Sequence, residues 1–461
     1  MFYTSKIKTK QGILEMKKII LSTVAIATMA TMANASTSSD IKTLKAQMAA
    51  MSEKLDTLET KEAKVAKKSN DLITIERKDS PEFLLGKETD INMKFQAQDN
   101  PDMWLKAGVR IQGTFENKET KNLTTGETNS LQDGYLRRTR FEIAAGFGKH
   151  SSFVMDVRND KANQGDGGER GFNVGDAYVK IKKPFDTSLV NFKLYRAKID
   201  VSRTETVKSA RVLVYDRPKV ADSAAQFITE NRRAANVQMY GDWNKKVHYQ
   251  VAFGDATATD HTVDASGADL DGSIKDQNFF YGGKIVLSPF DGWEETARTE
   301  TYFGEGKHFA VGVGYWKAGG INYETEDGLL IDTDHTLLNY ELSAHYKNAF
   351  IQAEYFDFDG VVKDFTPGLA PAETGKSSGW YATGEYIIPE LGYIAPFFRY
   401  EKWDKWDDAE GYDFTSKMAG VNWYLRGNTI KVGALLQKDT YGAEIGNKET
   451  TSARITSQWF F

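Results

Sequence analysis

Residues 104–116 read WLKAGVRIQGTFE, and this stretch determines how the rest of the chain is interpreted. Its apolar side chains, Leu105, Ala107, Val109 and Ile111, alternate with polar ones. Successive side chains of a β-strand point to opposite sides, so a repeat of two residues indicates a strand with one apolar and one polar face. Segments of the same kind, each roughly ten residues long, follow one another to the end of the chain. The sequence therefore predicts an all-β fold.

The connectors between these segments alternate in length. Short ones such as 148–150, 244–245 and 347–348 are separated by long polar ones. Alternating strands also occur in soluble two-sheet sandwiches, but short turns on one side and long loops on the other are typical of outer-membrane barrels. We therefore expect a 16-stranded antiparallel transmembrane β-barrel over residues 103–461. Its expected strands are 104–116, 135–147, 151–160, 174–183, 188–196, 232–243, 246–254, 277–288, 308–317, 337–346, 349–358, 379–388, 393–403, 414–425, 429–438 and 450–461.

One connector departs from the alternation. Residues 289–307 hold nineteen residues where a short turn is expected, and they include a TARTETYF stretch that resembles a strand. Aromatic residues mark the strand ends, as they do at membrane–water interfaces. They are Trp243, Trp293, Tyr315, Trp316, Trp380, Tyr381, Tyr393, Tyr400, Trp403, Trp423, Tyr424 and Trp459. The ending ARITSQWFF, with its terminal Phe461, resembles the sorting signal read by the bacterial barrel-assembly machinery, which we therefore expect as a partner.

The amino terminus predicts export. From Met16, which is a possible true start, two lysines precede an apolar stretch and an Ala33-Asn34-Ala35 site, the layout of a signal peptide over residues 1–35. A short membrane anchor is the alternative, although the apolar run is short for a span. Removal of 1–35 leaves 54 basic and 63 acidic side chains, a net charge of −9, which argues against a nucleic-acid partner. The absence of cysteine fits an exported chain without disulfides, and no later apolar run is long enough for a helical membrane protein.

A different pattern follows the cleavage site. Apolar residues in 36–68 keep heptad spacing, which predicts a short N-terminal coiled-coil helix in the periplasm. A coiled coil needs partner chains, and three is the natural number for a porin, so a homotrimer is expected. A lone amphipathic helix is the alternative. Residues 69–102, with Pro81 and Pro101, read as a linker.

A barrel of this size leaves an aqueous channel, so passage of small solutes is the expected function. The longest connector, residues 197–231, is expected to fold inward as a constriction loop. Residues 196–233 contain nine basic and five acidic side chains in a chain that is acidic overall. Rings of Arg or Lys attract anions in a low-dielectric tunnel, which makes this segment a candidate anion site. Its expected residues are Arg196, Lys198, Arg203, Lys208, Arg211, Arg217, Arg232 and Arg233. Alternatively, these charges pair with their acidic neighbours in solvent.

The first strands carry further basic residues on the face expected to line the pore. They are Arg110, Arg138, Arg140, Arg158, Lys180 and Lys182, with Lys193 beside them. Seven acids share that face around the barrel: Glu116, Glu142, Asp156, Glu341, Glu354, Glu385 and Glu401. Opposed basic and acidic walls produce a transverse field, which suits a general pore as well as a selective one. The wall residues therefore leave the preferred solute open.

Three blocks resemble a known family. They are LQDGYLRRTRFEIAAGFGKHSSFVMDVRND, VGDAYVKIKKPFDTSLVNFKLYRAKIDVSRTETVKSARVLVYDRP and ENRRAANVQMYGDWNKKVHYQVAFGDA. They look like the paired-arginine strand, the "DAY" strand with its inward loop, and the arginine-bearing strand of the phosphate-selective porin O and P family. The similarity covers most of 104–461, and its specific part is about 131–256. It implies sixteen strands, a trimer and transport of anions such as phosphate. The acids Asp200, Glu205 and Asp216, interleaved with the basic loop residues, depart from tight phosphate selectivity.

No pattern for catalysis or for a cofactor emerges. The six histidines are scattered without a metal-protease motif, and no G-x-S-x-G elbow is present. We therefore expect a non-enzymatic anion-preferring porin of the Gram-negative outer membrane, surrounded by lipid and lipopolysaccharide. A general, weakly selective porin is the alternative, and an outer-membrane barrel enzyme is less favoured.

Overall fold

The structure, a computed structural model, describes residues 46, 49–50, 53, 73–74, 81–88, 93–97, 99–164, 171–229, 233–256, 261–263, 269–290, 298–325, 330–362 and 374–460. The chain divides into two compact units, Met1–Asp71 and Leu72–Phe461. The predicted signal peptide and, apart from four helical positions, the predicted coiled coil lie outside the described residues, as do Arg232, Trp293 and Phe461. Among the described residues no helix is long and apolar enough to cross a membrane.

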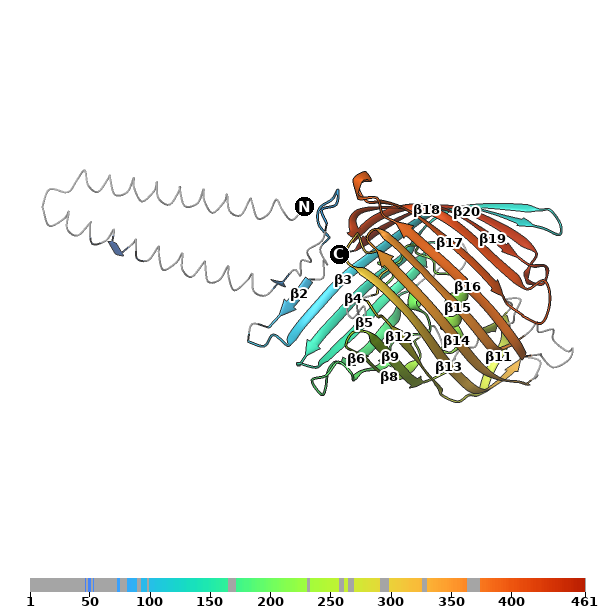
Figure 1. Cartoon of the computed structure of the whole chain (residues 1–461), viewed down its shortest axis with the longest axis horizontal. Coiled ribbons are helices and arrows are strands. Elements are labelled where there is room, and N and C mark those ends of the chain that lie inside the picture. The colour runs from blue at the N-terminus through green and yellow to red at the C-terminus, as the bar shows by residue number, and fades with distance from the viewer. Residues whose placement is uncertain are drawn as a thin grey trace. The chain divides into compact units, whose positions relative to one another are not determined.

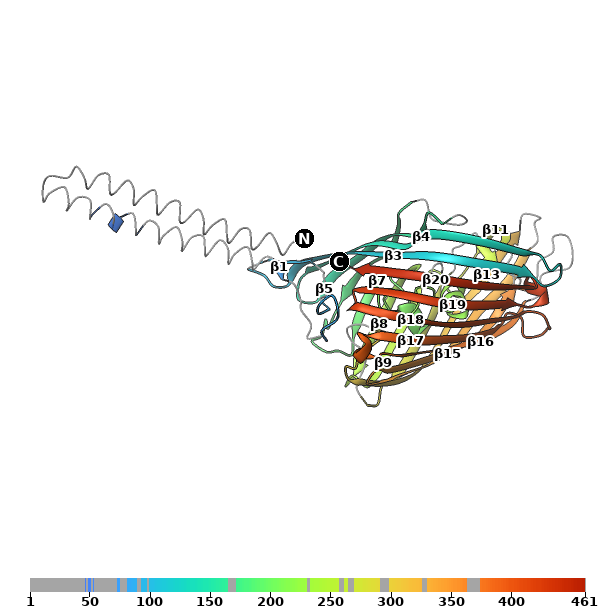
Figure 2. The same ribbon diagram turned by 90° about the horizontal axis from the view of Figure 1, so that it is seen from above.

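The predicted sixteen-stranded antiparallel barrel is confirmed (Figure 1). In the part of the chain that the structure describes, its strands are β3 (Met103–Asn122), β4 (Thr128–Phe147), β5 (Ser151–Ala162), β6 (Asn173–Ile181), β7 (Asn191–Arg196), β8 (Ala235–Trp243), β9 (Val247–Gly254), β12 (Phe280–Leu287), β13 (Lys307–Thr325), β14 (Leu330–Tyr346), β15 (Ala349–Val362), β16 (Thr374–Tyr386), β17 (Ile394–Asp404), β18 (Asp413–Asn428), β19 (Ile430–Tyr441) and β20 (Lys448–Phe460). Figure 2 shows β20, in red, beside β3, in cyan, where the barrel closes.

Four short strands add to this barrel. β1 (Ile73–Thr74) pairs with β2 (Met93–Gln96), and β2 pairs with the start of β3, so part of the predicted linker is paired backbone. β10 (His261–Val263) and β11 (Asp269–Asp276) belong to the connector between β9 and β12, and β11 pairs with the far end of β13. The TARTETYF stretch forms no strand over its described residues, 298–303.

The two faces of the barrel wall differ as the period of two requires. Large apolar side chains such as Phe115, Val313 and Leu436 are exposed on the outside. The aromatic pairs split between the faces: in Tyr315-Trp316 the tyrosine is 43% exposed and the tryptophan 0%. The pairs Trp380-Tyr381 and Trp423-Tyr424 divide in the same way. One member of each pair therefore faces outward, and the other packs inside the barrel.

Two of these inward aromatic residues, Trp316 and Tyr381, are covered by the connector between β7 and β8. This connector, called the inward loop below (residues 197–234), contains α3 (Arg203–Thr206) and α4 (Lys219–Phe227). Val201, Val220 and Ala224 pack in one buried cluster with Trp316 of β13 and Tyr381 of β16. Burial of apolar surface against the wall holds the loop inside the barrel. The lumen is therefore divided by protein instead of being open across its width.

Candidate functional site

In the described part of the chain, two cavities lie beside the inward loop, one against β3–β9 and the other against β3–β5 and β17–β20. The cavity at the end of the short turns has a volume of about 410 Å³ and is lined by seven basic and four acidic side chains. The cavity at the end of the long loops has a volume of about 680 Å³ and is lined by twelve basic and six acidic side chains. Arg140 lines both, so the two cavities meet at this residue. We call them the turn-end cavity and the loop-end cavity.

Three arginines lie in direct cross-strand register at this meeting point. Arg110 of β3 is paired with Arg140 of β4, and Arg140 is paired with Arg158 of β5. Like charges directly opposite one another destabilise a sheet, so their neighbours must compensate. Arg110 forms an ion pair with Glu142, and Arg140 Nη2 lies 3.3 Å from Asp160 Oδ2. We call Arg110, Arg140 and Arg158 the arginine row.

The inward loop turns some of its basic side chains toward the cavities and others toward the wall. Lys198 and Lys208 line the turn-end cavity, while Arg217 and Arg233 line the loop-end cavity. Each also contacts a neighbour inside the barrel: Lys208 Nζ lies 2.5 Å from Glu142 Oε2, and Arg233 Nε lies 2.5 Å from Asp176 Oδ1. The pore-facing charge of the loop is thus partly balanced by acids on the strands.

Arg203 points away from the cavities. It is 2% exposed, donates to Gln352 of β15 and to the Thr299 carbonyl, and lies over the Phe350 ring. Arg196, the last residue of β7, donates from Nε to the Gly175 carbonyl. Arg211 is half-buried and lines neither cavity. These three residues, which the sequence placed in the constriction, line neither cavity.

The predicted wall residues differ in whether they line a cavity. Arg110, Arg138, Arg140, Arg158 and Lys180 line one or both cavities. Lys182 follows the end of β6 in the exposed turn, where its backbone N–H donates to the His150 carbonyl, and it lines neither cavity. The strand ends one residue before Lys182, so the alternation that aimed the even-numbered side chains of β6 into the lumen no longer applies there.

The acidic wall opposite lies beneath the inward loop. Glu354 of β15 accepts hydrogen bonds from the backbone N–H groups of Arg203 and Thr204, at 2.9 and 3.1 Å, and from the Ser202 hydroxyl. Glu401 of β17 accepts from the Val220 N–H at 2.6 Å and is 2% exposed. Glu341, Glu354 and Glu385 line neither cavity. Glu354 and Glu401 therefore hold the loop, and of these two only Glu401 also lines a cavity.

The far side of the loop is fixed at Asp216. Its carboxylate accepts from Arg137 Nε at 2.6 Å and from Arg454 Nη1 at 3.0 Å, and its carbonyl accepts from Arg399 at 2.7 Å. Burial alone would raise the pKa of this carboxyl, but Arg137, Arg454 and Arg138 outweigh burial and hold the pKa well below its ordinary value. Asp216 therefore stays charged and ties the loop to β4, β17 and β20.

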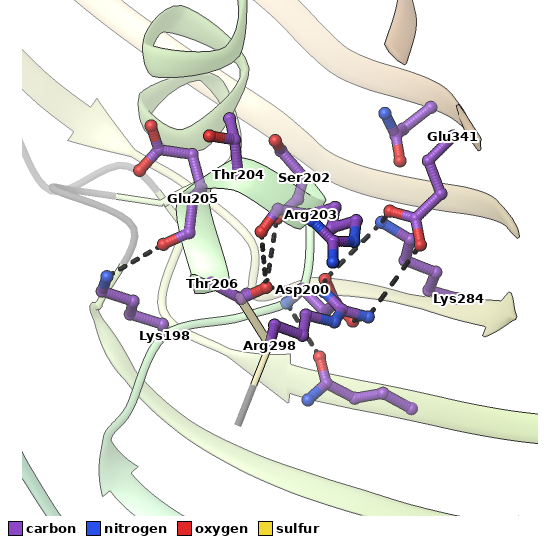
Figure 3. A network of polar contacts seen from close by, with 12 residues as sticks. Lys198, Asp200, Ser202, Arg203, Thr204, Glu205, Thr206, Lys284, Arg298 and Glu341 are labelled. Carbon is purple, nitrogen blue, oxygen red and sulfur yellow. Dashed lines mark hydrogen bonds and ion pairs between the residues drawn. The ribbon is translucent and has the colours of Figure 1, made fainter. Parts of the chain in front are cut away.

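A second segment reaches the loop from the turn end. The connector between β12 and β13, which the sequence marked as too long for a turn, brings Arg298 to Asp200 (Figure 3). Both Nη atoms donate to the Asp200 carboxylate, at 2.7 and 2.8 Å, and Nη1 also donates to the Thr206 hydroxyl at 2.6 Å. Two residues on, Glu300 accepts from the Thr204 hydroxyl and the Leu213 N–H. The connector thus clamps both ends of the first half of the loop.

This clamp neutralises a loop acid that lines the turn-end cavity. Asp200 also lies 3.5 Å from Lys284 of β12, which pairs with Glu341 (Figure 3). Burial by itself raises the pKa of Asp200, but Arg298 and Lys284 together keep it well below its ordinary value. Asp200 is therefore a charged carboxylate, and Arg298 is the cation that balances it.

Sequence reasoning missed several lining residues. Arg137, Lys219, Arg298, Arg399 and Arg454 all line a cavity, and none was among the predicted site residues. The unusual length of 289–307 was the signal for Arg298. Arg399 and Arg454 are polar members of alternating strands and could have been found by extending the inward-facing count to β17 and β20. Among the described residues, no group of three or more His, Cys, Asp or Glu side chains could hold a metal ion.

Comparison with known proteins supports the barrel fold. No family model matches the chain. A curated relative, an uncharacterized protein of Aquifex aeolicus (strain VF5), is 23% identical over 418 residues, which make up 86% of this chain and 96% of the relative. The two chains therefore match along most of their lengths.

Solved structures of low sequence identity share the architecture. They include an anion-selective porin from Comamonas acidovorans (TM-score 0.51, 10% identity, 77% of this chain and 99% of that one). The outer membrane channel DcaP of Acinetobacter baumannii has a TM-score of 0.52 and 11% identity over 80% of this chain and 99% of its own. OprB of Pseudomonas putida has a TM-score of 0.51 and 11% identity over 77% of this chain and 94% of its own. At these identities the likeness shows the fold alone: the chain has the fold of a porin.

Proposed function

We propose that the chain is a passive channel of the outer membrane that admits small solutes and prefers anions. The observation that carries the proposal is the position of the inward loop. The loop covers Glu354, and neither Glu341 nor Glu385 lines a cavity, while the arginine row and basic loop residues line the remaining space. Positive side chains in a low-dielectric passage raise the local concentration of anions. The lumen is therefore basic although the chain is acidic overall.

Unpaired donors support an anion near the arginine row. The buried Nε atoms of Arg110, Arg138 and Arg140 have no hydrogen-bond partner among the described residues. Buried donors in folded proteins are usually satisfied by protein, water or an ion. A guanidinium can give two parallel hydrogen bonds to an oxyanion, which makes phosphate a suitable passing solute. Phosphate is thus the first oxyanion to test.

A conductance measurement tests this proposal. The purified protein in a planar bilayer should give a large ohmic conductance in KCl that falls when phosphate is added. In Arg140→Gln the anion-to-cation permeability ratio should fall roughly fivefold, because a unit charge about 4 Å from an ion in water contributes about 1 kcal/mol. Lys149→Gln, which removes an exposed charge in the turn after β4, is the matched control and should leave the ratio unchanged. An Arg140→Gln channel with wild-type selectivity would remove the arginine row from the mechanism.

A general, weakly selective porin is the second candidate. It is favoured by the ion pairs inside the channel, since Arg110 and Lys208 share Glu142 and Arg233 pairs with Asp176. A permeability ratio close to one, unaffected by phosphate, would select this candidate over the anion-preferring one.

The cellular setting of the channel is part of the proposal. A closed barrel satisfies every strand edge and is one of the two architectures that can cross a bilayer. We propose a homotrimer in the Gram-negative outer membrane, in contact with lipid and lipopolysaccharide and inserted by the barrel-assembly machinery through the carboxyl-terminal Phe461. Residues 1–35 are proposed as the signal peptide and 36–68 as a periplasmic coiled coil. Heat-modifiable gel mobility of the membrane-extracted protein, with and without residues 36–68, tests the trimer and the contribution of that segment.

A further inference from the structure

The outer face of the barrel carries an apolar groove where β18, β19, β20 and β3 lie side by side (Figure 2). We call it the outer groove, and its volume is about 1030 Å³. Ala419 of β18 and Ala453 of β20 are both paired with Leu436 of β19, and Ala434 is paired with Ile455. Leu436 is 63% exposed and Ile455 is 58% exposed. Small side chains between large, outward-pointing ones therefore hollow the wall at this point.

Two lysines border the outer groove on the side of the long loops. Lys417 of β18 is paired with Lys438 of β19, and each follows the apolar groove residue of its own strand by two positions. Both lysines are exposed. Lys438 Nζ lies 2.8 Å from Glu449 Oε2, and Glu449 is paired one step further from the groove, opposite Thr440. Along β18 and β19, Lys417 and Lys438, called the lysine row, are thus the first outward charges beyond the groove.

Aromatic residues of the neighbouring strands mark the depth of the lysine row. Tyr400 of β17 is paired with Lys417, and its ring centroid lies 5.3 Å from that of Trp380 of β16. Trp380 is paired with Tyr355 of β15, and both are exposed on the outer face. Tyr and Trp on the outside of a barrel lie at the membrane–water interface. In the proposed membrane, the lysine row therefore lies at the level of the headgroups, and the outer groove lies at the level of the acyl chains.

Building on the proposed placement in the outer membrane, we propose that this surface is a binding site for a lipid whose headgroup carries phosphate. The phosphate oxygens accept hydrogen bonds from Lys417 and Lys438, and an acyl chain lies in the groove over Ala434 and Ala453. The charges are complementary, since lysines at the membrane surface attract anionic headgroups. The long loops of such barrels face outward, so the lipid belongs to the outer leaflet.

Purified lipopolysaccharide, a phosphorylated lipid of that leaflet, is the probe. A fluorescent form is titrated with the detergent-solubilised channel, and its anisotropy gives the dissociation constant. Lys417→Gln and Lys438→Gln should each weaken binding roughly fivefold, the contribution of one lysine near a charged lipid surface. Lys317→Gln, which removes a lysine of β13 outside the groove, is the matched control and should bind like the wild-type channel. Unchanged binding in the double lysine variant would overturn the proposal.

A second variant tests the groove without touching the lysines. Ala434→Phe combined with Ala453→Phe fills the hollow with apolar side chains, so the barrel keeps its lipid-facing character while the space for an acyl chain is lost. Binding of lipopolysaccharide should weaken, although both lysines remain. Binding as tight as in the wild-type channel would show that the headgroup phosphate alone is recognised, and this result would overturn the groove as a lipid site.

The remaining outcomes concern a second copy of the chain and the proposed function. The sequence contains no cysteine, so oxidation of Leu436→Cys in membrane vesicles links only copies that meet at the groove. The variant should stay unlinked on a non-reducing gel, and a linked dimer would overturn the proposal. Lipid binding is measured without a current. A channel without anion preference would therefore overturn the proposed function alone, and an anion-preferring channel with equal affinity in all variants would overturn the lipid site alone.

Discussion

At the scale of single residues, Arg298 decides whether a loop carboxylate acts on passing ions. Asp200 is held charged by its neighbours and lines the turn-end cavity. In Arg298→Met that negative charge loses its bidentate partner, so the permeability ratio should shift toward cations, by roughly fivefold for one unit charge. Reversal potentials in a KCl gradient measure the shift.

A double variant distinguishes an effect of the Asp200 charge from an effect of loop displacement. Arg298→Met combined with Asp200→Asn removes both charges and should return the reversal potential to near the wild-type value, as expected for coupled neighbours. If the double variant stays as cation-shifted as the single one, loop displacement and not the Asp200 charge is responsible.

Two loop lysines are expected to give the proposed channel a pH dependence. Burial lowers the pKa of Lys198 well below its ordinary value of 10.5, and Arg233 and Arg217 lower it further. Burial also lowers the pKa of Lys208, against the opposing effect of Glu142. A lysine whose pKa is lowered loses its charge as pH rises through that lowered pKa. Anion preference should therefore decline on the alkaline side at a pH below the ordinary lysine range, and Lys198→Met with Lys208→Met should remove the decline.

The reversal potential between neutral pH and pH 10 measures this effect. A preference that stays constant up to pH 10 in the wild-type channel would show that neither lysine contributes charge to the pore.

The sequence showed which loop positions are charged, but not the direction in which each charged side chain points. Lys198 and Arg203 are both basic and only five positions apart, yet one lines a cavity and the other is buried against Gln352. Their directions depend on contacts with β15 and with the 298–302 connector, which are distant in the sequence. No local spacing encodes such contacts, so the candidate site could be predicted as a segment and not residue by residue.

At the scale of elements, the attachment of the inward loop depends on carboxylates of the opposite wall. Glu354 satisfies two backbone N–H groups where α3 begins. Replacement by alanine leaves these buried donors without a partner, which should weaken the attachment of the loop by about 1–3 kcal/mol. Glu354→Ala channels should show larger current noise and a higher mean conductance in single-channel records.

The control for this variant is Glu119→Ala. Glu119 is an exposed carboxylate near the long-loop end of β3. If both variants conduct like the wild-type channel, the loop does not depend on the Glu354 anchor.

The strands were predicted in number and order, but several, such as β3 and β4, are longer than predicted, while others, such as β7 and β12, are shorter. β3 was expected over 104–116 and extends to Asn122, and β4 begins at Thr128 instead of 135. Residues 117–122, NKETKN, have no apolar face, because a strand that continues beyond the bilayer has no lipid to face. Apolar alternation therefore marks the lipid-facing part of each strand and does not detect the part that extends beyond it.

The adjacent aromatic pairs indicate more than the position of the membrane–water interface. Period two requires that Trp316 face inward if Tyr315 faces outward. A large aromatic side chain facing the lumen indicates that protein, not water, lies against it, and Trp316 indeed packs in the cluster beneath the inward loop. The same reasoning applied to Tyr381 would have located the loop on this wall from sequence.

At the scale of the whole molecule, the outer face of the barrel should behave as a surface solvated by lipid. Val313 is 46% exposed in the middle part of β13. Val313→Arg should destabilise the barrel by about 2–4 kcal/mol, the cost of a basic residue at the bilayer midplane. Guanidinium unfolding in lipid vesicles measures the change.

The matched control for Val313→Arg faces the lumen. Gln437 lines the loop-end cavity and follows the outward-facing Leu436 on β19, so Gln437→Arg should have little effect on unfolding. Equal destabilisation by the two variants would contradict the assignment of the outer face to lipid.

The barrel as a whole was predictable because it rests on a repeated local signal, the period of two, together with the order of connectors. Its internal division was not, because the inward loop is fixed by single residues of many strands, such as Asp216 with Arg137, Arg399 and Arg454. The sequence predicted one basic and one acidic wall, and this pattern did not indicate which solute is preferred. In the structure, Glu354 and Glu401 anchor the loop, and the arginine row lines the space that remains.

The measurement that tests this account most directly is the zero-current potential of the wild-type channel in a planar bilayer under a tenfold KCl gradient. If the inward loop covers the acidic wall and leaves the basic one in water, the potential carries the sign of preferred chloride passage, and it diminishes in Arg140→Gln. A potential of zero, or one with the sign of preferred potassium passage, would contradict the account.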